Sequence, residues 1–172
     1  MCGVVGIISS NKPVAGELYD SLIHLQHRGQ DAAGIMTYNE RFHIKKGTGL
    51  IRDIFDEQNM SRLLGKVGVG HTRYPTVGGF SIEEAQPVYT HVPYGIAMAH
   101  NGNIVNYTDL SKEVVEKDRR HVNSSVDIEV ILHIFAHAME SNDRASDSSE
   151  FFDHICDSVK TVYGRVKGAY SV

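Results

Sequence analysis

Near the start of the chain, a continuous run of apolar residues is followed by apolar residues at helical spacing. Residues 3–8 form a short apolar run, which is typical of a buried strand. In residues 14–26 the apolar side chains recur at helical spacing, so this segment predicts an amphipathic helix. The stripe on that helix consists of Val14, Leu18, Leu22 and Leu25. The chain therefore opens with a predicted strand and a helix.

The remaining sequence divides into short strands, helices and two long loops. Further strands are predicted near residues 32–38, 42–46, 67–71 and 96–100, and another begins at 169–172. Further helices are predicted at 54–64, 108–117, 126–139 and 150–163, with Asp53 and Thr108 as N-caps of the first two. Asn39-Glu40 and Asn101-Gly102 are predicted turns, the second a tight hairpin turn. Long loops with short strands are predicted at 73–95, and a flexible polar connection is predicted at 141–149.

This succession of elements predicts an α+β fold. The strands are short and do not alternate one-to-one with helices, which favours antiparallel α+β layers over a doubly wound parallel sheet. The last predicted strand, after Gly168, is still running when the sequence stops. We therefore expect residues 1–172 to be one domain, truncated at its C-terminal end and cut from a longer protein.

Composition narrows the class of protein without identifying it. The chain has 172 residues, 41% of them hydrophobic, and a net charge of −4, which excludes disordered and collagen-like classes and gives no reason to expect a nucleic-acid partner. We find no apolar stretch long enough to span a membrane and no signal peptide, so a cytoplasmic protein is expected. Cys2 and Cys156 are too few for a disulfide scaffold or an iron–sulfur cluster.

The position of Cys2 gives it a chemical option that other cysteines lack. Removal of Met1 leaves Cys2 with its own α-amino group, whose ordinary pKa of roughly 7.7–8.0 lets it accept the thiol proton near neutral pH. With Met1 retained, the same nitrogen is an amide and cannot act as a base. The alternative is a second residue that packs as a small hydrophobe.

Five other residues complete a possible site around such a nucleophile. The amide of Asn101 and the N–H of Gly102 are suited to an oxyanion hole, although a plain turn is the alternative. Arg73, which is suited to a carboxylate, is followed by the hydroxyl of Thr76, while a surface salt bridge is its alternative. Asp127 can accept an ammonium group or simply favour a helix N-terminus. Together with Cys2, these groups fit an amino acid with a side-chain amide, namely glutamine.

The histidines allow two other interpretations. His71 or His100 could form a Cys–His dyad with Cys2, although the N-terminal amine makes a histidine base unnecessary. His133 and His137 are spaced i, i+4, which suits two zinc ligands, but no HExxH pattern or third ligand accompanies them. We expect this pair to be an ordinary packed or exposed helix pair, and we expect no metal.

Several blocks of sequence resemble the class II glutamine amidotransferases. They begin with MCGVVGI at residues 1–7. The other blocks are HRGQDAAGI (27–35), GHTRYPT (70–76), EAQP (84–87), AHNGN (99–103), RRHVNSSVDIEV (119–130) and GAYSV (168–172). These are closest to the branch of that family that aminates phosphoribosyl pyrophosphate in the first committed step of purine synthesis. The branch that aminates a sugar phosphate differs at the positions of Tyr74 and His27.

The resemblance implies a fold and a set of roles. The fold is the N-terminal-nucleophile hydrolase fold, a four-layer α/β/β/α sandwich with antiparallel sheets. Cys2 matches the nucleophile, Asn101 and Gly102 the oxyanion hole, and Arg73 and Asp127 the glutamine-binding residues. Arg28 matches a residue near the nucleophile, which we group with the glutamine-binding residues.

The resemblance also implies what lies outside this chain. The phosphoribosyltransferase domain, which requires Mg²⁺, is absent, and the full-length protein is expected to be a homo-oligomer. The glutaminase reaction itself requires no cofactor. The alternatives are the glutaminase domain of another class II enzyme, such as the sugar-phosphate branch, and an inactive module that only binds glutamine.

Overall fold

The computed structural model describes residues 2–74, 81–141 and 145–172 in two compact units. The first unit contains Met1–Val88, Ala97–Gly102 and Ser171–Val172, and the second contains Tyr89–Ile96 and Asn103–Tyr170. Within the described ranges, no helix has both the length and the apolar character needed to cross a membrane.

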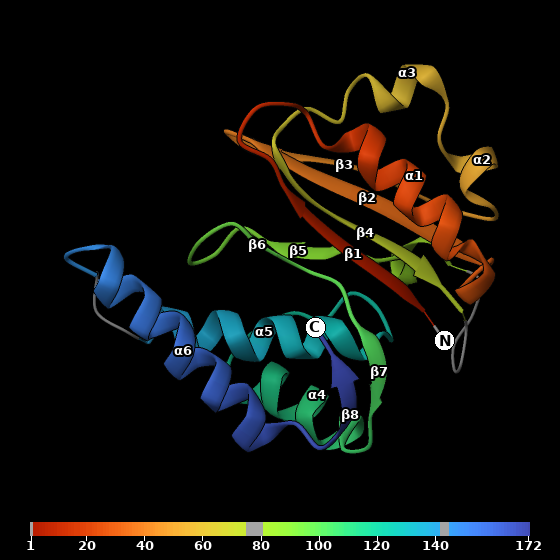
Figure 1. Cartoon of the computed structure of the whole chain (residues 1–172). Helices are drawn as coiled ribbons and strands as arrows, with labels where there is room; N and C mark the ends of the chain where they lie inside the picture. Colours follow the sequence, from red (N-terminus) through yellow and green to blue (C-terminus); the bar gives the residue numbers. More distant parts are fainter. Residues whose placement is uncertain (1, 75–80, 142–144) are drawn as a thin grey trace. The chain divides into compact units, whose positions relative to one another are not determined.

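A four-stranded antiparallel sheet forms the framework of the first unit (Figure 1). Its strands are β1 (Gly3–Ile8), β2 (Ala32–Asn39), β3 (Arg41–Thr48) and β4 (Val67–Arg73). Their order is β1-β4-β2-β3, so β1 and β3 are the edges. The predicted hairpin between β2 and β3 is confirmed, with Glu40 in the left-handed region (φ 59°) between the paired residues Asn39 and Arg41. The prediction of an α+β fold with an antiparallel sheet is confirmed.

Helix α1 (Ala15–Leu25) lies across one face of this sheet (Figure 1). Its predicted stripe is buried at Val14, Leu18 and Leu22. These side chains share a core with Ile35 of β2, which is also fully buried. The short 3₁₀ helix η1 (Gln26–Arg28) continues α1 and leads into β2.

The prediction of a single helix at 54–64 is wrong. The structure has two short helices, α2 (Ile51–Ile54) and α3 (Glu57–Met60), separated by extended backbone at Phe55. Asp56, rather than Asp53, caps the second helix, because its Oδ1 accepts the N–H of Asn59 at 2.7 Å. Two side-chain bonds stabilise the break. The Asp56 cap starts α3, and Asn59 Nδ2 donates to the carbonyl oxygen of Ile54, the last residue of α2, at 3.0 Å.

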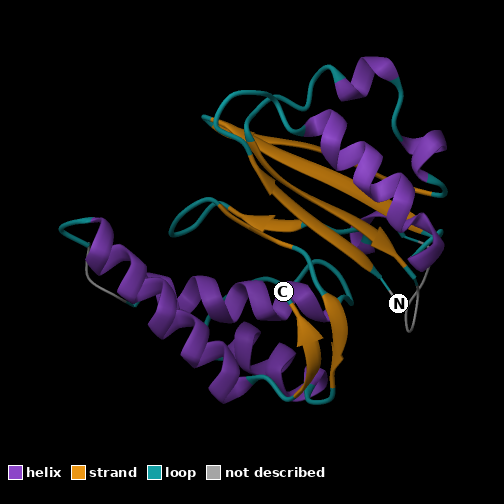
Figure 2. Ribbon diagram, viewed as in Figure 1, coloured by secondary structure: helices purple, strands orange, loops and turns teal. Residues whose placement is uncertain are grey.

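Three packed helices make up most of the second unit (Figure 2). They are α4 (Tyr107–Glu116), α5 (Asp127–Glu140) and α6 (Ser148–Arg165). Helix α5 packs against both α4 and α6 and is buried along most of its length. Thr108 lies inside the first turn of α4, whose N-cap is Asn106, so the cap predicted from sequence is displaced by two residues.

Two small two-stranded sheets and a short 3₁₀ helix complete the fold. Strand β5 (Val88–Thr90) pairs with β6 (Ile96–Met98), and β7 (Asn101–Ile104) pairs with β8 (Gly168–Ser171). The 3₁₀ helix η2 (Ile82–Glu84) lies in the region predicted as loops. Asn101 and Gly102 are thus in a strand, and the predicted tight turn is wrong because their partner strand lies at the far end of the sequence.

Candidate functional site

Cys2 lies in a pocket of about 290 Å³ in the first unit. Residues from both ends of the sequence and from its middle contribute to the pocket. They are Cys2, Gly3, Val4, Leu25, Arg28, Asn101, Ser171 and Val172. Three of the residues predicted from the sequence, Cys2, Arg28 and Asn101, are therefore brought together.

Each polar group of Cys2 has an identified partner in this pocket. Its backbone nitrogen donates to Asn101 Oδ1 at 3.2 Å. Its carbonyl oxygen accepts from Arg28 Nε at 3.0 Å, and its Sγ donates to the carbonyl oxygen of Tyr74 at 3.8 Å. The nitrogen, the thiol and the carbonyl of Cys2 are therefore held by three different segments of the chain.

The backbone beside Cys2 is held close to β4. The N–H of Gly3 donates to Thr72 Oγ1 at 3.1 Å, and a Cβ on Gly3 would lie 2.7 Å from the same oxygen. A Cβ on Gly29 would lie 2.6 Å from the carbonyl carbon of Arg73. These contacts require glycine at both positions because any side chain would push the Cys2 and Arg28 segments away from β4.

The residue before Asn101 is held by two buried side chains. The N–H of His100 donates to Gln86 Oε1 at 2.7 Å, and Gln86 Nε2 lies 3.2 Å from His100 Nδ1. His71 Nε2 lies 3.1 Å from the carbonyl oxygen of His100. Burial, together with the neighbouring His100, lowers the pKa of His71 to about 3. His71 is therefore neutral at physiological pH and donates from Nε2, since a carbonyl oxygen can only accept.

Arg73 is buried at the end of β4 and forms an ion pair. Its Nη2 donates to Glu84 Oε2 at 2.6 Å, and both side chains are almost fully buried. This carboxylate partner comes from η2 and was not predicted from the sequence. A guanidinium carries five N–H donors in a planar fork, a geometry that suits bidentate recognition of carboxylates.

Two predicted glutamine-binding residues stand apart from this set. Thr76 lies outside the described residues. Asp127 belongs to the second unit, where it opens α5 and its Oδ2 accepts the N–H of Ile104 at 3.1 Å. The expected role of Asp127 toward an ammonium group stays a prediction.

The histidines considered as alternatives are absent from the described residues that line the Cys2 pocket. His71 bonds to His100, and His100 also bonds to Gln86, whereas the hydrogen bond from the Cys2 thiol goes to Tyr74. In the second unit, His133 Nε2 lies 3.8 Å from Glu129 Oε1. Over residues 2–74, 81–141 and 145–172, no group of three or more His, Cys, Asp or Glu side chains is placed to hold a metal ion.

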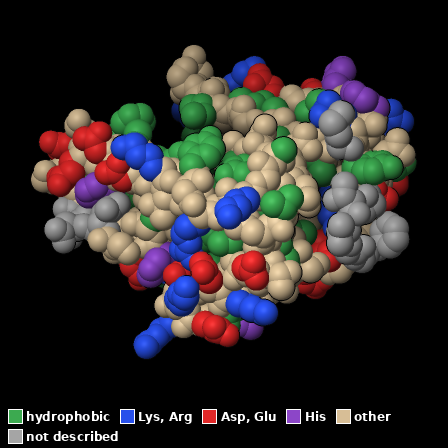
Figure 3. Space-filling model, turned by 90° about the horizontal axis from the view of Figure 1, so that it is seen from below, with side chains coloured by type: hydrophobic (Ala, Val, Ile, Leu, Met, Phe, Trp, Pro, Cys, Tyr) green, Lys and Arg blue, Asp and Glu red, His purple; other side chains and the backbone are tan. Residues whose placement is uncertain are grey.

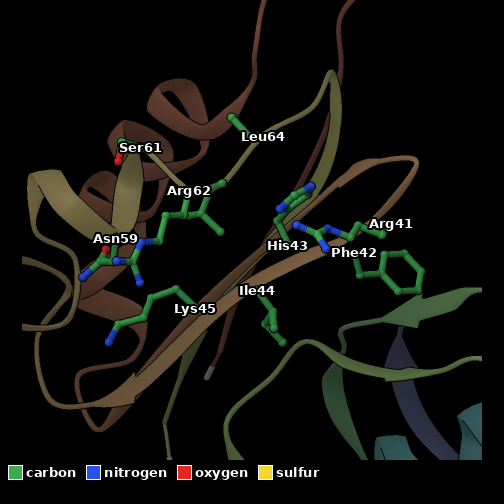
Figure 4. Close-up of a pocket in the computed structure, with 10 residues that line it drawn as sticks. Arg41, Phe42, His43, Ile44, Lys45, Asn59, Ser61, Arg62 and Leu64 are labelled. Carbon is green, nitrogen blue, oxygen red and sulfur yellow. The ribbon is translucent and has the colours of Figure 1, made fainter.

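A second, larger pocket of about 650 Å³ lies elsewhere in the first unit (Figure 4). Strand β3 forms one wall and the segment after α3 forms the other. Its lining contains none of the residues predicted for the glutamine site. The lining includes several basic side chains, whereas basic and acidic side chains are intermingled on the molecular face seen in Figure 3.

Sequence reasoning missed Thr72, Glu84 and Gln86. They lie within the blocks GHTRYPT and EAQP, which carried the resemblance without indicating a role for these residues. Their contacts supply that role. Glu84 holds the predicted residue Arg73, whereas Thr72 and Gln86 hold Gly3 and His100, the chain neighbours of Cys2 and Asn101.

Comparison with known proteins gives a consistent picture. A family model described as "Glutamine amidotransferase domain" matches residues 55–143. The amidophosphoribosyltransferase of Pseudomonas aeruginosa is 47% identical over 100% of this chain and 34% of its own length. That of Saccharomyces cerevisiae is 45% identical over 99% of this chain and 34% of its own length.

Solved structures give the same match. The glutamine phosphoribosylpyrophosphate amidotransferase of B. subtilis, complexed with ADP and GMP, superimposes with a TM-score of 0.77 at 32% identity. It covers 99% of this chain and 34% of the B. subtilis chain. A structure described as the allosteric regulatory enzyme of purine biosynthesis gives a TM-score of 0.79 at 33% identity over the same shares. The chain spans about a third of the length of each of these relatives.

Proposed function

Because this chain belongs to the glutamine amidotransferase domain family, we propose that it hydrolyses glutamine to glutamate and ammonia with Cys2 as the nucleophile. The observation that carries this proposal is the 3.2 Å contact between the Cys2 nitrogen and Asn101 Oδ1. It joins the proposed base to the proposed oxyanion-hole residue across 99 positions of sequence.

The first half of the reaction forms a thioester. The α-amine of Cys2, freed by loss of Met1, takes the thiol proton, and the thiolate attacks the side-chain carbonyl carbon of glutamine. Since Asn101 Oδ1 accepts from the Cys2 nitrogen, the Nδ2 end of the same amide is left to donate to the oxyanion, together with the N–H of Gly102. The tetrahedral intermediate collapses when the proton passes from the amine to the leaving nitrogen, which departs as ammonia.

The second half regenerates the enzyme. Water, deprotonated by the same amine, attacks the glutamyl thioester, and the C–S bond breaks to release glutamate. The returned proton restores the thiol. Arg28 contributes by fixing the Cys2 carbonyl, which keeps the amine and the thiol in place during both steps. No metal or other cofactor takes part in this half-reaction.

Glutamine binding is assigned to charged groups that match its α-carbon substituents. Arg73 binds the α-carboxylate, supported by Thr76, and Asp127 binds the α-ammonium group. Support for Arg73 is its fixed guanidinium at the end of β4, beside the segment of Gly29 and Arg28. Support for Asp127 is the resemblance of its sequence block to the family.

The relatives indicate a larger setting for this chain. We propose that it supplies ammonia to a phosphoribosyltransferase domain that aminates phosphoribosyl pyrophosphate in purine biosynthesis, with Mg²⁺ needed only by that domain. The same proposal includes the four-layer N-terminal-nucleophile sandwich, a cytoplasmic location and a homo-oligomeric full-length protein. Stimulation of glutamine hydrolysis by phosphoribosyl pyrophosphate, and not by a sugar phosphate, in the full-length protein is the expected result.

Replacement of Asn101 tests the glutaminase proposal. Asn101→Ala removes both ends of the amide, so kcat for glutamine hydrolysis should fall about 10²–10³-fold, as for other oxyanion-hole donors. Equal amounts of glutamate and ammonia should appear in the wild-type reaction. Asn103→Ala is the matched control in the same strand and should keep full activity. Wild-type protein that binds glutamine without releasing ammonia would identify an inactive binding module instead.

A further inference from the structure

The buried surroundings of His100 indicate residues that position the oxyanion hole. Three polar groups of His100 are bonded to two side chains from other elements: its N–H and Nδ1 to Gln86, and its carbonyl oxygen to His71. Gln86 is 3% exposed and His71 is fully buried. We call His71 and Gln86 the His100 clamp.

The clamp acts on Asn101 through the peptide bond. The carbonyl group of His100 and the N–H of Asn101 belong to one rigid peptide plane. A hydrogen bond from His71 to this carbonyl therefore sets the direction in which the Asn101 backbone leaves His100. The Asn101 side chain then reaches the Cys2 nitrogen at 3.2 Å.

We propose that His71 and Gln86 are positioning residues that hold Asn101 and Gly102 in register with Cys2. This inference rests on the proposed glutaminase function. Both residues act through His100 and contact neither glutamine nor the thiol. The neutral state of His71 suits this role because its Nε2 proton, needed for the bond to the carbonyl oxygen, stays in place across the working pH range.

Paired substitutions separate positioning from general stability. His71→Met keeps side-chain volume but removes the donor, and His71→Gln keeps an N–H donor near the same place. Gln86→Met removes both bonds to His100. Thr37→Val is the matched control, because Thr37 is buried in the same sheet and its Oγ1 donates to the carbonyl oxygen of Leu64 at 2.7 Å.

The expected result is a selective loss of kcat. His71→Met and Gln86→Met should lower kcat for glutamine hydrolysis about 10–100-fold with KM changed less than about threefold, since a small misplacement of reacting groups is enough for this effect. His71→Gln should recover most of the rate. Thr37→Val should leave kcat unchanged, even if its melting temperature falls as much as those of the His71 and Gln86 variants. Absence of wild-type turnover would reject the glutaminase proposal itself.

Hydrogen exchange supplies a readout that does not depend on turnover. The amide protons of His100 and Asn101 should exchange faster in His71→Met and Gln86→Met, and at the wild-type rate in Thr37→Val. Unchanged exchange would show that the clamp does not hold this segment. The proposal would also be overturned if His71→Met and Gln86→Met exchanged faster but kept the wild-type kcat. The same holds if Thr37→Val lost as much kcat as they do.

A separate observation concerns the pocket beside the edge strand β3. Arg41, His43 and Lys45 alternate with Phe42 and Ile44, so they share one face of the strand. The register pairs Lys45 with Ile35, a core residue under α1, so this is the helix-covered face of the sheet. At the edge strand this face is not covered. Arg41 is exposed and His43 and Lys45 are half-buried, and all three line the pocket.

The opposite wall of the pocket adds to the positive charge. Arg62 comes from the segment after α3, together with the polar side chains of Asn59 and Ser61 (Figure 4). No acidic residue lines the pocket. Throughout the described part of the chain, Arg41, Lys45 and Arg62 have no side-chain hydrogen bond or ion pair. The pocket volume, about 650 Å³, falls within the range of small-molecule sites.

We infer that this pocket binds a small phosphorylated anion with at least two phosphate groups. Arginine forks match phosphate oxygens, and residues two apart on a strand lie about 7 Å apart, so one ligand can contact both Arg41 and His43 or both His43 and Lys45. Basic residues on an edge strand can also serve only to block aggregation. That simpler role does not account for Arg62, which lies on the other wall.

Calorimetric titration with inorganic tripolyphosphate in about 0.15 M salt tests this site. Saturable binding is expected, with at least about tenfold weaker affinity in the double variant Arg41→Ala, Arg62→Ala. Arg52→Ala, an exposed arginine in α2 outside the pocket, should bind as the wild type does. No binding, or equal weak binding by all three proteins, would overturn the inference. Aggregation of the double variant without wild-type binding would show that the charges only protect the edge.

Discussion

The two units each contain a buried polar cluster, but the clusters carry different charge. In the first unit, His71 and Gln86 hold His100 through buried hydrogen bonds in which neither His71 nor Gln86 is charged. In the second unit, the carboxylate of Glu129 accepts the N–H groups of Asn123 and Ser124, each at 2.8 Å, and is 7% exposed. Both clusters fix a segment whose backbone groups would otherwise be unsatisfied.

Protonation states follow from these surroundings. Burial disfavours the charged form in both clusters. For His71 nothing outweighs that effect, and its pKa falls to about 3. For Glu129 burial is outweighed by His133 and by the donors of Ser124 and Asn123, and the pKa of the carboxyl falls to about 2. In the first cluster His71 is therefore neutral and adjoins the proposed chemistry, whereas in the second cluster Glu129 is anionic and fixes the start of α5.

We expect changes at the candidate site of the first unit to alter activity and changes at Glu129 to alter stability. The largest effect is expected for Cys2→Ala, which removes the nucleophile of the first unit. Glutamine hydrolysis should fall at least about 10³-fold while glutamine binding stays near the wild-type level. Cys156→Ala, which removes the other thiol, should retain full activity. Measured turnover by Cys2→Ala above this limit would contradict the mechanism.

Arg73→Ala is expected to have the next largest effect, and it acts on binding. Loss of a charge-assisted, bidentate contact with the glutamine carboxylate should raise KM about 10–100-fold with a smaller change in kcat. The substitution also removes the ion pair of buried Glu84 and so destabilises the fold. The double variant Arg73→Gln, Glu84→Gln removes both charges and serves as the folding control. A wild-type KM in a folded Arg73 variant would remove Arg73 from the glutamine site.

Glu129→Gln should show the opposite pattern to the site variants. Weakening the bonds from Asn123 and Ser124 to a charged acceptor should lower the free energy of unfolding by about 2 kcal/mol. At a temperature where the variant is folded, kcat should match the wild type. Urea denaturation and the glutaminase assay on the same samples check both statements, and a large loss of kcat would remove the distinction between the clusters.

The smallest expected effects concern the pH dependence of the free energy of unfolding. The two clusters should affect it in different pH ranges. Folding lowers the pKa of His71 from 6.5 to about 3. As pH falls, His71 is therefore protonated in the unfolded chain before it is protonated in the folded protein, and stability is lost between pH 6.5 and about 3. The pKa of Glu129 is lowered from 4.5 to about 2, so its contribution is present above pH 4.5 and is lost as pH falls toward 2.

The variants His71→Gln and Glu129→Gln test which residue causes the loss of stability in each pH range. Between pH 7 and about 5, His71→Gln should lose less unfolding free energy than the wild type, while Glu129→Gln should follow the wild type. Below about pH 4.5, Glu129→Gln should show the flatter dependence. Urea unfolding at several pH values measures both, and identical profiles for all three proteins would contradict the assigned protonation states.

Local sequence patterns predicted the elements that depend on local periodicity. Helix α1, the β2–β3 hairpin and the long buried helix α5 all follow from period and turn residues. The failures have tertiary causes. The pairing of Asn101 and Gly102 with β8 joins segments more than sixty residues apart, which no local pattern reveals. The break between α2 and α3 is stabilised by the side chains of Asp56 and Asn59, whose bonds to backbone groups end one helix and start the next.

The candidate site shows the same division. Residue chemistry identified Cys2, Asn101 and Arg73, because their side chains do the proposed work directly. It could not identify Gln86, Glu84 or Thr72, because these side chains act only through the residues that they contact. An amide or a hydroxyl gives no sign in sequence of which backbone group it will hold, since that depends on how distant segments are brought together.

The most direct test of the central claim is the intact mass of the protein before and after treatment with 6-diazo-5-oxo-norleucine, a glutamine analogue that alkylates the nucleophile of glutaminases. The account predicts loss of Met1 and one adduct located on Cys2, with no adduct on Cys156. Protein that has lost Met1 and yet gains no adduct on Cys2 would contradict the claim that Cys2 and its pocket form a glutamine site.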